Sequence, residues 1–389
     1  MSVSFQMKTA ERTKRAVSLD LARGAMLLLI ALAHVPLYLY ALEPGIVHRV
    51  ESQNFFDQIV NLFGMLVIDN RARPMFAVLF GYGLALAFDS RIAKGSREKD
   101  AIQMIRRRSW YLILFGAVLA VIIGGQDILM AYGVAGLLVN WLLPRENKIL
   151  IRTFLFITLF YIIVNPILWG FLMESMGAYG FPPEVLATDT YLSTMMLSLI
   201  SFPFIPILIH SMFPILPSVL LGMWMARYQL LIKPEQQLRT LCFITMIGLA
   251  VSILGALPLT FIGNIWNPSF FLFGFVYGYH ILTGIAGGLA YAGFFGIIGT
   301  TLKKEGPFLR SFMALGKRSL TFYVWNETML VLLLSPVALD LGGQISNGIA
   351  ALIAVGIWSL SLLLATIFEK HHLNGPLETV MRRFVYKNH

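Results

Sequence analysis

The sequence has little charge and almost no cysteine. Only 13% of its 389 residues are charged, about half the share typical of soluble globular proteins. Such a chain has too few polar side chains to cover a water-soluble body. The one cysteine, Cys242, excludes an intrachain disulfide framework. Phosphate-binding P-loops, the nucleophile elbow G-x-S-x-G and the zinc motif H-E-x-x-H are also missing.

Long apolar runs take the place of the missing charge. They include Ala25–Leu32, Ser109–Ile123 and Ile349–Phe368. Because about 20 apolar residues cross the hydrocarbon core, we expect an all-α polytopic membrane protein with about ten transmembrane helices. The predicted spans are 19–40, 74–90, 107–124, 127–143, 149–170, 208–228, 239–261, 279–300, 319–338 and 347–368.

The placement of basic residues predicts the orientation of these spans. With the amino terminus in the cytoplasm, 27 of the 30 lysines and arginines lie in or beside cytoplasmic segments, and only Arg49, Arg71 and Arg73 lie outside. This is the positive-inside rule, and it accounts for the net charge of +10 without a nucleic-acid partner. We expect a cytoplasmic segment at 1–18, one transmembrane domain at 19–368 and a cytoplasmic tail at 369–389 in the plasma membrane. The first apolar run is expected to be an uncleaved helix.

Two stretches are too long for one simple span. Residues 55–90 contain two apolar runs around Arg71, Arg73 and Pro74. Two crossings there would place the basic loop 89–108 outside, so we expect an interfacial or re-entrant helix at 55–69 followed by one span. Residues 191–228 carry four prolines, which break helices, so an outer segment and one span are expected there as well.

Ionisable residues inside the predicted spans are candidate functional groups, because charge is costly in a bilayer. Arg23 and His34 lie eleven residues apart, close to three helical turns, so they share a face about 16 Å long. Equally, Arg23 could reach the headgroups and His34 could be a satisfied buried histidine. Glu327 falls near the midplane and needs protonation or a partner such as arginine or histidine.

The remaining ionisable residues each have a structural alternative. Arg71 and Arg73 could hold an anionic or carbonyl group or anchor the chain at the interface. Asp127 opens the fourth span, where capping is the leading role, although it could orient a histidine. His210 and His280 are interpreted as interfacial residues; no ligand spacing supports a metal site. Gly81, Gly83, Gly287 and Gly288 are expected to allow close helix packing.

Five short motifs resemble one bacterial family. They are Ser18-Leu-Asp-Leu-Ala-Arg-Gly24, Phe76-Ala-Val-Leu-Phe-Gly-Tyr-Gly83, Asp127-Ile-Leu-Met-Ala-Tyr-Gly133, Gly316-Lys-Arg-Ser-Leu-Thr-Phe-Tyr323 and Gly375-Pro-Leu-Glu378. Their order and spacing resemble the YeiB-like membrane proteins (domain of unknown function 418). That family is more remotely similar to the acyltransferase family 3 and to heparan-glucosaminide N-acetyltransferase. The spacing of Arg23 and His34 fits the arginine and histidine of family 3, whereas Arg71-x-Arg73 is one residue shorter than its Arg-x-x-Arg pair.

The resemblance implies acyl transfer across the membrane. Acyl-CoA, with acetyl-CoA the expected form, would bind on the cytoplasmic side at Arg23, Arg106, Arg107 and Arg108, with Arg15 nearby. His34 would act as the general base, or less favourably as a covalent relay, and Arg71 or Arg73 would stabilise the oxyanion. Asp127 and Glu327 complete the candidate catalytic set.

The expected partners are membrane lipids, acyl-CoA and an acceptor hydroxyl or amine such as that of a glycan; a homodimer stays open, and no metal is expected. Two other hypotheses remain. One is a transporter of lipids or small molecules with Glu327 and His34 as a proton-coupling pair. The other is a non-catalytic membrane sensor or assembly factor.

Overall fold

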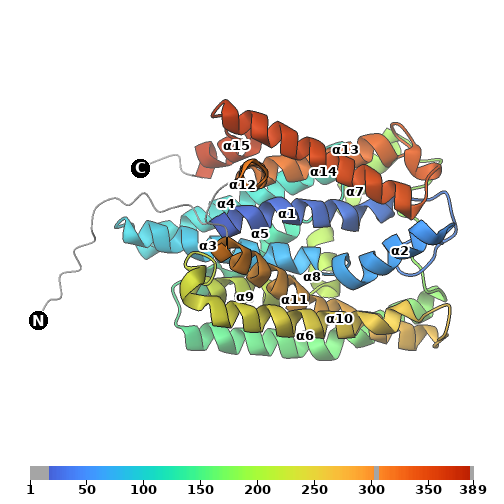
Figure 1. Ribbon diagram of the computed structural model, residues 1–389, viewed down its shortest axis with the longest axis horizontal. Helices are drawn as coiled ribbons and strands as arrows, with labels where there is room; N and C mark the ends of the chain where they lie inside the picture. The colour runs from blue at the N-terminus through green and yellow to red at the C-terminus, as the bar shows by residue number, and fades with distance from the viewer. Residues whose placement is uncertain (1–16, 302–305, 386–389) are drawn as a thin grey trace, which may run out of the picture.

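The computed structural model describes residues 17–301 and 306–385, and in this part of the chain the secondary structure is helical throughout (Figure 1). Residues 1–16, which include Arg15 and most of the expected amino-terminal segment, lie outside the described residues. The described α-helices are α1 (Val17–His34), α2 (Phe55–Phe63), α3 (Ala72–Ala93), α4 (Glu98–Val118), α5 (Leu129–Val139), α6 (Asn147–Met176), α7 (Tyr191–Ser201), α8 (Ile205–Met212), α9 (Ile215–Arg227), α10 (Leu238–Thr260), α11 (Phe270–Thr301), α12 (Pro307–Lys317), α13 (Ser319–Leu334), α14 (Asn347–Lys370) and α15 (Pro376–Val385).

The longer helices run along one common direction, so the bundle has two ends (Figure 1). We name the end at which α1 begins and α15 lies the basic end, because the linkers that meet there are rich in lysine and arginine. The linkers 39–54, 177–190, 261–269 and 335–346 lie at the opposite end.

Six helical units are long and apolar enough to cross a membrane by length and composition, or seven if the pair α7 and α8, bent by 70°, counts as one span. The protein is therefore an all-helical, multi-pass membrane protein. The six units are Val17–Tyr38, Phe55–Ala93, Asn147–Met176, Pro234–Thr260, Phe270–Thr301 and Asn347–Lys370. Three more apolar helices, α5, α9 and α13, are shorter than a full span.

The unit Phe55–Ala93 contains a break where the sequence indicates one. α2 passes into a short π-helix (Gly64–Ile68), and the chain then turns through Asp69 and the left-handed Asn70 before α3 begins. Its 39 residues would extend to about 58 Å at the helical rise, nearly twice the hydrocarbon thickness. The geometry is consistent with α2 lying beyond the core, at the opposite end of the bundle.

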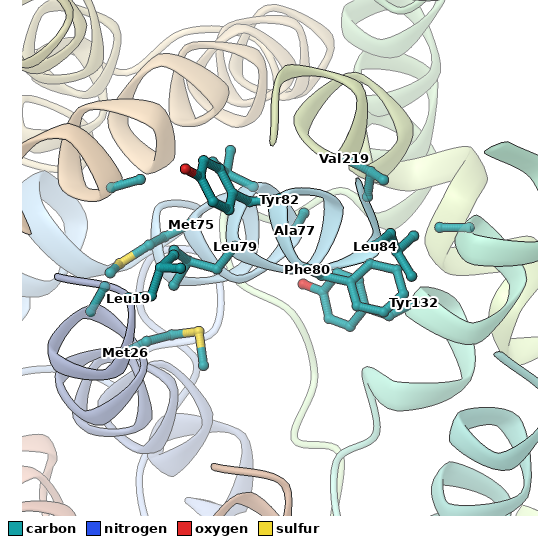
Figure 2. Packing of buried hydrophobic residues seen from close by; sticks show 14 of the residues in the cluster. Leu19, Met26, Met75, Ala77, Leu79, Phe80, Tyr82, Leu84, Tyr132 and Val219 are labelled. Carbon is teal, nitrogen blue, oxygen red and sulfur yellow. The ribbon is translucent and has the colours of Figure 1, made fainter. Parts of the chain in front are cut away.

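The core is formed where α1, α3, α5 and α9 pack together (Figure 2). Leu19 and Met26 of α1 approach Met75 and Leu79 of α3, and on the far side of α3 the Phe80 ring lies 5.6 Å from that of Tyr132 of α5. Together they fix the relative positions of the helices that carry the candidate site.

Glycines in the recognised motifs allow these helices to approach closely. A Cβ added to Gly81 would come within 2.0 Å of the Val219 carbonyl oxygen on α9, and one on Gly316 within 1.8 Å of the Asp20 carbonyl oxygen on α1. A Cβ on Gly288 would likewise meet the backbone nitrogen of Met75, 2.4 Å away. The expected packing role of Gly81 and of Gly288 is thus confirmed.

Candidate functional site

His34 and Glu327 form a buried pair at the centre of the candidate site. His34 is the last residue of α1, and Glu327 lies on α13, 293 residues away in the sequence. The His34 Nδ1 atom and the Glu327 Oε1 atom are 2.7 Å apart, and Glu327 is completely buried. The other carboxylate oxygen, Oε2, has no hydrogen-bond partner among the described residues. With Nδ1–H donated to the carboxylate, the lone pair of His34 lies on Nε2, as a general base requires.

The non-helical segment 124–128 lies beside this pair and is fixed by two tyrosines. The Tyr323 hydroxyl donates to the Gln126 carbonyl oxygen and accepts from the Ile128 N–H, and the Tyr38 hydroxyl accepts from the Gln126 N–H. A Cβ on Gly125 would lie 3.3 Å from that of Glu327. Because non-helical backbone at membrane depth is tolerated only where it is buried or lines a cavity, these bonds account for its stability.

Asp127 caps α5, as the sequence predicts. Its two carboxylate oxygens accept from the Leu129 and Met130 N–H groups, each at 2.9 Å. A carboxylate is favourable at this position because the helix N-terminus carries free donors and a partial positive charge. Asp127 is also within electrostatic range of His34 and Glu327 and is not hydrogen-bonded to either.

Arg73 faces the interior near this cluster. Its guanidinium carbon lies 3.7 Å above the centre of the Phe213 ring, and Glu184 interacts electrostatically with both Arg73 and His34. The Tyr132 hydroxyl donates to the Arg73 carbonyl oxygen. Within the described part of the chain, Arg73 forms no carboxylate ion pair. A half-buried cation that forms no ion pair can stabilise developing negative charge.

Arg71 has a different environment from Arg73, although only one residue separates them. It is completely buried and faces α10 and α11. Its guanidinium donates to the Ser252 hydroxyl and carbonyl oxygens, to the carbonyl oxygens of Met65 and Asp69, and lies 3.2 Å from a His280 ring nitrogen. The structure therefore does not bring Arg71 to the His34 pair.

The three histidines predicted to lie within the spans, His34, His210 and His280, each have different neighbours. His280 is 1% exposed, so its interpretation as an interfacial residue is wrong: α11 begins at Phe270, about 15 Å before it, rather than at the expected 279. His210, on α8, contacts the Ala131 carbonyl oxygen through Nε2 at 3.0 Å. Among residues 17–301 and 306–385, no group of three or more histidine, cysteine or acidic side chains is placed to hold a metal ion.

A cavity of about 610 Å³ extends from the basic end towards the pair. Its walls come from α1, α3, α4, α5, α12, α13 and α15, with a lining that is largely apolar. Four cations line it, Arg23, Arg108, Lys317 and Arg382, together with two carboxylates, Asp20 and Glu378. Tyr132 and Tyr323 also line it, and Tyr323 precedes Glu327 by one helical turn, or about 6 Å.

The cavity changes the predicted set of basic ligands. Arg23 and Arg108 line it, but Arg106 donates to Asn140 and Arg107 is exposed, and neither contributes to the lining. Three consecutive arginines on one helix cannot share a face, because each residue advances the helix by about 100°. Lys317 and Arg382 were missed, although Lys317 lies within a recognised motif and Arg382 follows another by about one helical turn.

A polar chain leads from segment 124–128 to the opposite end. The Gln126 side chain donates to Glu184 Oε2 at 2.7 Å, and the other Glu184 oxygen lies 3.9 Å from His48 Nδ1. The His48 ring stacks on Phe181, with 4.5 Å between ring centres. Desolvation lowers the pKa of the half-buried His48 to about 4. The basic end thus approaches the His34 region through a cavity lined by charged residues, whereas the opposite end approaches it through one hydrogen bond and a longer polar contact.

Comparison with known proteins finds a family match for the carboxy-terminal part of this chain. Residues 225–388, from the end of α9 onwards, match the model described as "Protein of unknown function (DUF418)". The match includes two of the five motifs, Gly316–Tyr323 and Gly375–Glu378. No curated protein matches the chain. The resemblance expected from the motifs is confirmed at the level of this family, and the remoter similarity to acyltransferases stays a prediction. Residues 225–388, the carboxy-terminal part of the chain, are thus similar to the DUF418 family.

Proposed function

We propose that this protein is a membrane-embedded acyltransferase that moves an acyl group from cytoplasmic acyl-CoA to an acceptor hydroxyl or amine on the other side of the membrane. One observation carries the proposal. A cavity lined by four cations ends at Tyr323, and the buried His34–Glu327 pair lies one helical turn beyond Tyr323 along α13. In this proposal the basic end faces the cytoplasm of the plasma membrane, with both termini there. The short helices α5, α9 and α13, together with α4, supply the additional crossings of a ten-span topology.

The cavity suits an elongated ligand with phosphates at one end. Arg23, Arg108, Lys317 and Arg382 would bind the phosphates of CoA, since guanidinium and ammonium groups form strong charge-assisted hydrogen bonds to them. The apolar lining would hold the pantetheine arm. Tyr323 separates the end of the cavity from Glu327, so the thioester would reach His34 after rotation of the Tyr323 side chain. Acetyl-CoA is the expected donor.

The proposed reaction uses the His34 pair as a general base. Nε2 of His34 takes the proton of the acceptor while the acceptor oxygen or nitrogen attacks the thioester carbonyl. Glu327 accepts the Nδ1–H bond and stabilises the imidazolium. Arg73 stabilises the oxyanion. When the C–S bond breaks, the thiolate of CoA takes the proton back from His34, so the products are the acylated acceptor and free CoA.

Vesicles with the cytoplasmic face outward would test the proposal. Radiolabelled acetyl-CoA is added, and label is measured in the extracted lipid and glycan fractions. We expect incorporation with the unaltered protein and a loss of about 10²- to 10⁴-fold with His34→Ala. The variant should keep a single symmetric peak in size-exclusion chromatography. Full incorporation with His34→Ala, or no acetyl-CoA binding by the purified protein, would reject this function.

A proton-coupled transporter is the second candidate. It is favoured by the polar side chains Gln126, Glu184 and His48, which lie in succession between segment 124–128, beside the pair, and the opposite end. Intramembrane carboxylates and histidines are typical of proton relays. Counterflow of a solute into liposomes that contain the purified protein and no acyl donor would support transport over acyl transfer.

A further inference from the structure

The motif Gly375-Pro-Leu-Glu378 begins a helix that forms one wall of the cavity. Glu378, Met381, Arg382 and Val385 of α15 all line it, at spacings of three, four and seven residues. Residues at these spacings lie on one face of a helix. On a neighbouring position of α15, the ring of Phe384 stacks on that of Tyr111 of α4 at 5.5 Å. The whole inward face of α15 thus belongs to the cavity.

The Glu378 carboxylate binds the start of another helix, α13. Its Oε1 atom accepts from the Leu320 N–H at 2.8 Å and the Thr321 N–H at 3.2 Å, and Oε2 accepts from the Thr321 hydroxyl. Because α13 begins at Ser319 and Arg318 provides no side-chain cap, these N–H groups have no partner within their own helix. The cap of α13 therefore comes from α15.

The sequence of the motif is explained by this bond. A Cβ on Gly375 would lie 1.9 Å from Glu378 Oε2 and 2.7 Å from the Thr321 hydroxyl oxygen, so a larger residue would push the carboxylate out of place. Pro376 is the first residue of α15, where its fixed φ and missing N–H are favourable. Glycine, proline and glutamate act together to direct the carboxylate at α13.

The capped helix also carries residues of the candidate site. Tyr323 lines the cavity and Glu327 pairs with His34, and both follow Ser319 at four-residue intervals on α13. The turn before α15 is held separately, because the Arg318 guanidinium donates to the Leu373 carbonyl oxygen and to Glu369. Loss of the Glu378 bonds would therefore weaken the attachment of α15 to α13, leaving the hydrogen bond from the Leu377 N–H to the Thr321 hydroxyl, while the connection to α14 stays in place.

We infer that Glu378 is a positioning residue: by capping α13 it closes α15 over the cavity and fixes the helix that carries Tyr323 and Glu327. Release of this bond opens the cavity at the basic end. We call the hydrogen bonds from α13 to Glu378 the latch. The inference that the latch closes the cavity does not depend on which ligand binds there, and only the identification of that ligand as acyl-CoA rests on the proposed function.

Cysteine accessibility tests the latch directly. In a Cys242→Ser background, Leu112→Cys places a reporter on the cavity wall of α4, where the native side chain is 6% exposed. We expect Glu378→Ala to raise its rate of maleimide labelling about tenfold, the size of effect that loss of a helix cap has on an opening equilibrium. Glu378→Gln keeps one acceptor oxygen and should restore most of the protection.

Two controls separate opening from unfolding. Thr379→Ala is the matched variant, since the Thr379 hydroxyl bonds only to the Gly375 carbonyl oxygen, and its labelling rate should not change. A second reporter, Ala350→Cys on α14, lies outside the cavity and is fully buried; it should stay protected in every variant. Equal labelling of the Leu112→Cys reporter with and without Glu378→Ala, or faster labelling of both reporters, would overturn the inference. No acyl-CoA is added, so failure of the donor hypothesis would appear in the vesicle assay alone.

Discussion

Two buried histidines of this bundle each lie beside an ionisable partner, but their surroundings differ. His280 faces Arg71, whose donors are directed at Ser252, Met65 and Asp69. His34 faces Glu327, whose second carboxylate oxygen has no partner among the described residues. A satisfied buried network stabilises a fold, whereas an incompletely satisfied one is costly and persists where function needs it. Both histidines are buried, so burial alone does not distinguish a functional site from a structural one. The distinguishing feature of the His34 site is a buried carboxylate oxygen of Glu327 that has no hydrogen-bond partner among the described residues.

The largest expected effect is on activity, from Glu327→Gln. The amide oxygen can still accept from His34 but cannot stabilise an imidazolium, so acetyl transfer should fall by about 10²-fold or more. Thermal unfolding in detergent should change little or move upwards, because a buried charge with an unpartnered oxygen is removed. A large loss of thermal stability with unchanged acetyl transfer would mean that the His34–Glu327 pair has a structural role, like the hydrogen bonds of Arg71 to its neighbours.

The second effect is on folding, from Arg71→Ala. The change leaves the carbonyl oxygens of Ser252, Met65 and Asp69 without their donor, and we expect a loss of about 3 kcal/mol or more in the free energy of unfolding. Size-exclusion chromatography and thermal unfolding would measure it. Arg73→Ala, the nearby control, should cost less stability and more activity; the reverse order would exchange the roles assigned to the two arginines.

A smaller effect is expected from Asp127→Ala. Its carboxylate caps α5 through Leu129 and Met130, so removal should lower the free energy of unfolding by about 1 kcal/mol. Asp127→Asn keeps one acceptor and should lose less. Denaturant titration in detergent would compare the two. If transfer is lost while stability is kept, Asp127 belongs with the reactive pair rather than with the satisfied network.

The smallest effect concerns pH and His48 at the opposite end. Burial holds its pKa near 4, below that of an unfolded histidine, about 6.5. The unfolded chain therefore binds this proton first, so stability is complete above about pH 6.5 and declines as the pH falls towards 4. His48→Phe can keep the stack on Phe181 and should flatten the melting temperature over this range. An unchanged pH profile would show that His48 does not contribute to it.

Local patterns in the sequence identified most of the helices and several roles. Proline and charge placed the breaks near residues 70 and 203–214, and the position of Asp127 before an apolar run predicted its cap. The periodicity of apolar residues and the hydropathy of the chain could not show which neighbouring helix each side chain faces. The two arginines of Arg71-x-Arg73 looked equivalent in sequence, yet one faces α10 and α11 and the other faces Phe213. Arg106 and Arg107 likewise looked like phosphate ligands, but the turn of α4 directs them away from the cavity.

By itself, the sequence determined that this protein is helical and lies in a membrane, because apolar length and scarce charge leave no other stable arrangement. It also indicated that Arg23 and His34 share a helix face and that Glu327 needs a partner. Only the tertiary structure decided that this partner is His34, that Lys317 and Arg382 join Arg23 in one cavity, and that Glu378 caps α13. Such contacts join residues tens to hundreds of positions apart, and packing between helices, rather than periodicity within one helix, selects them.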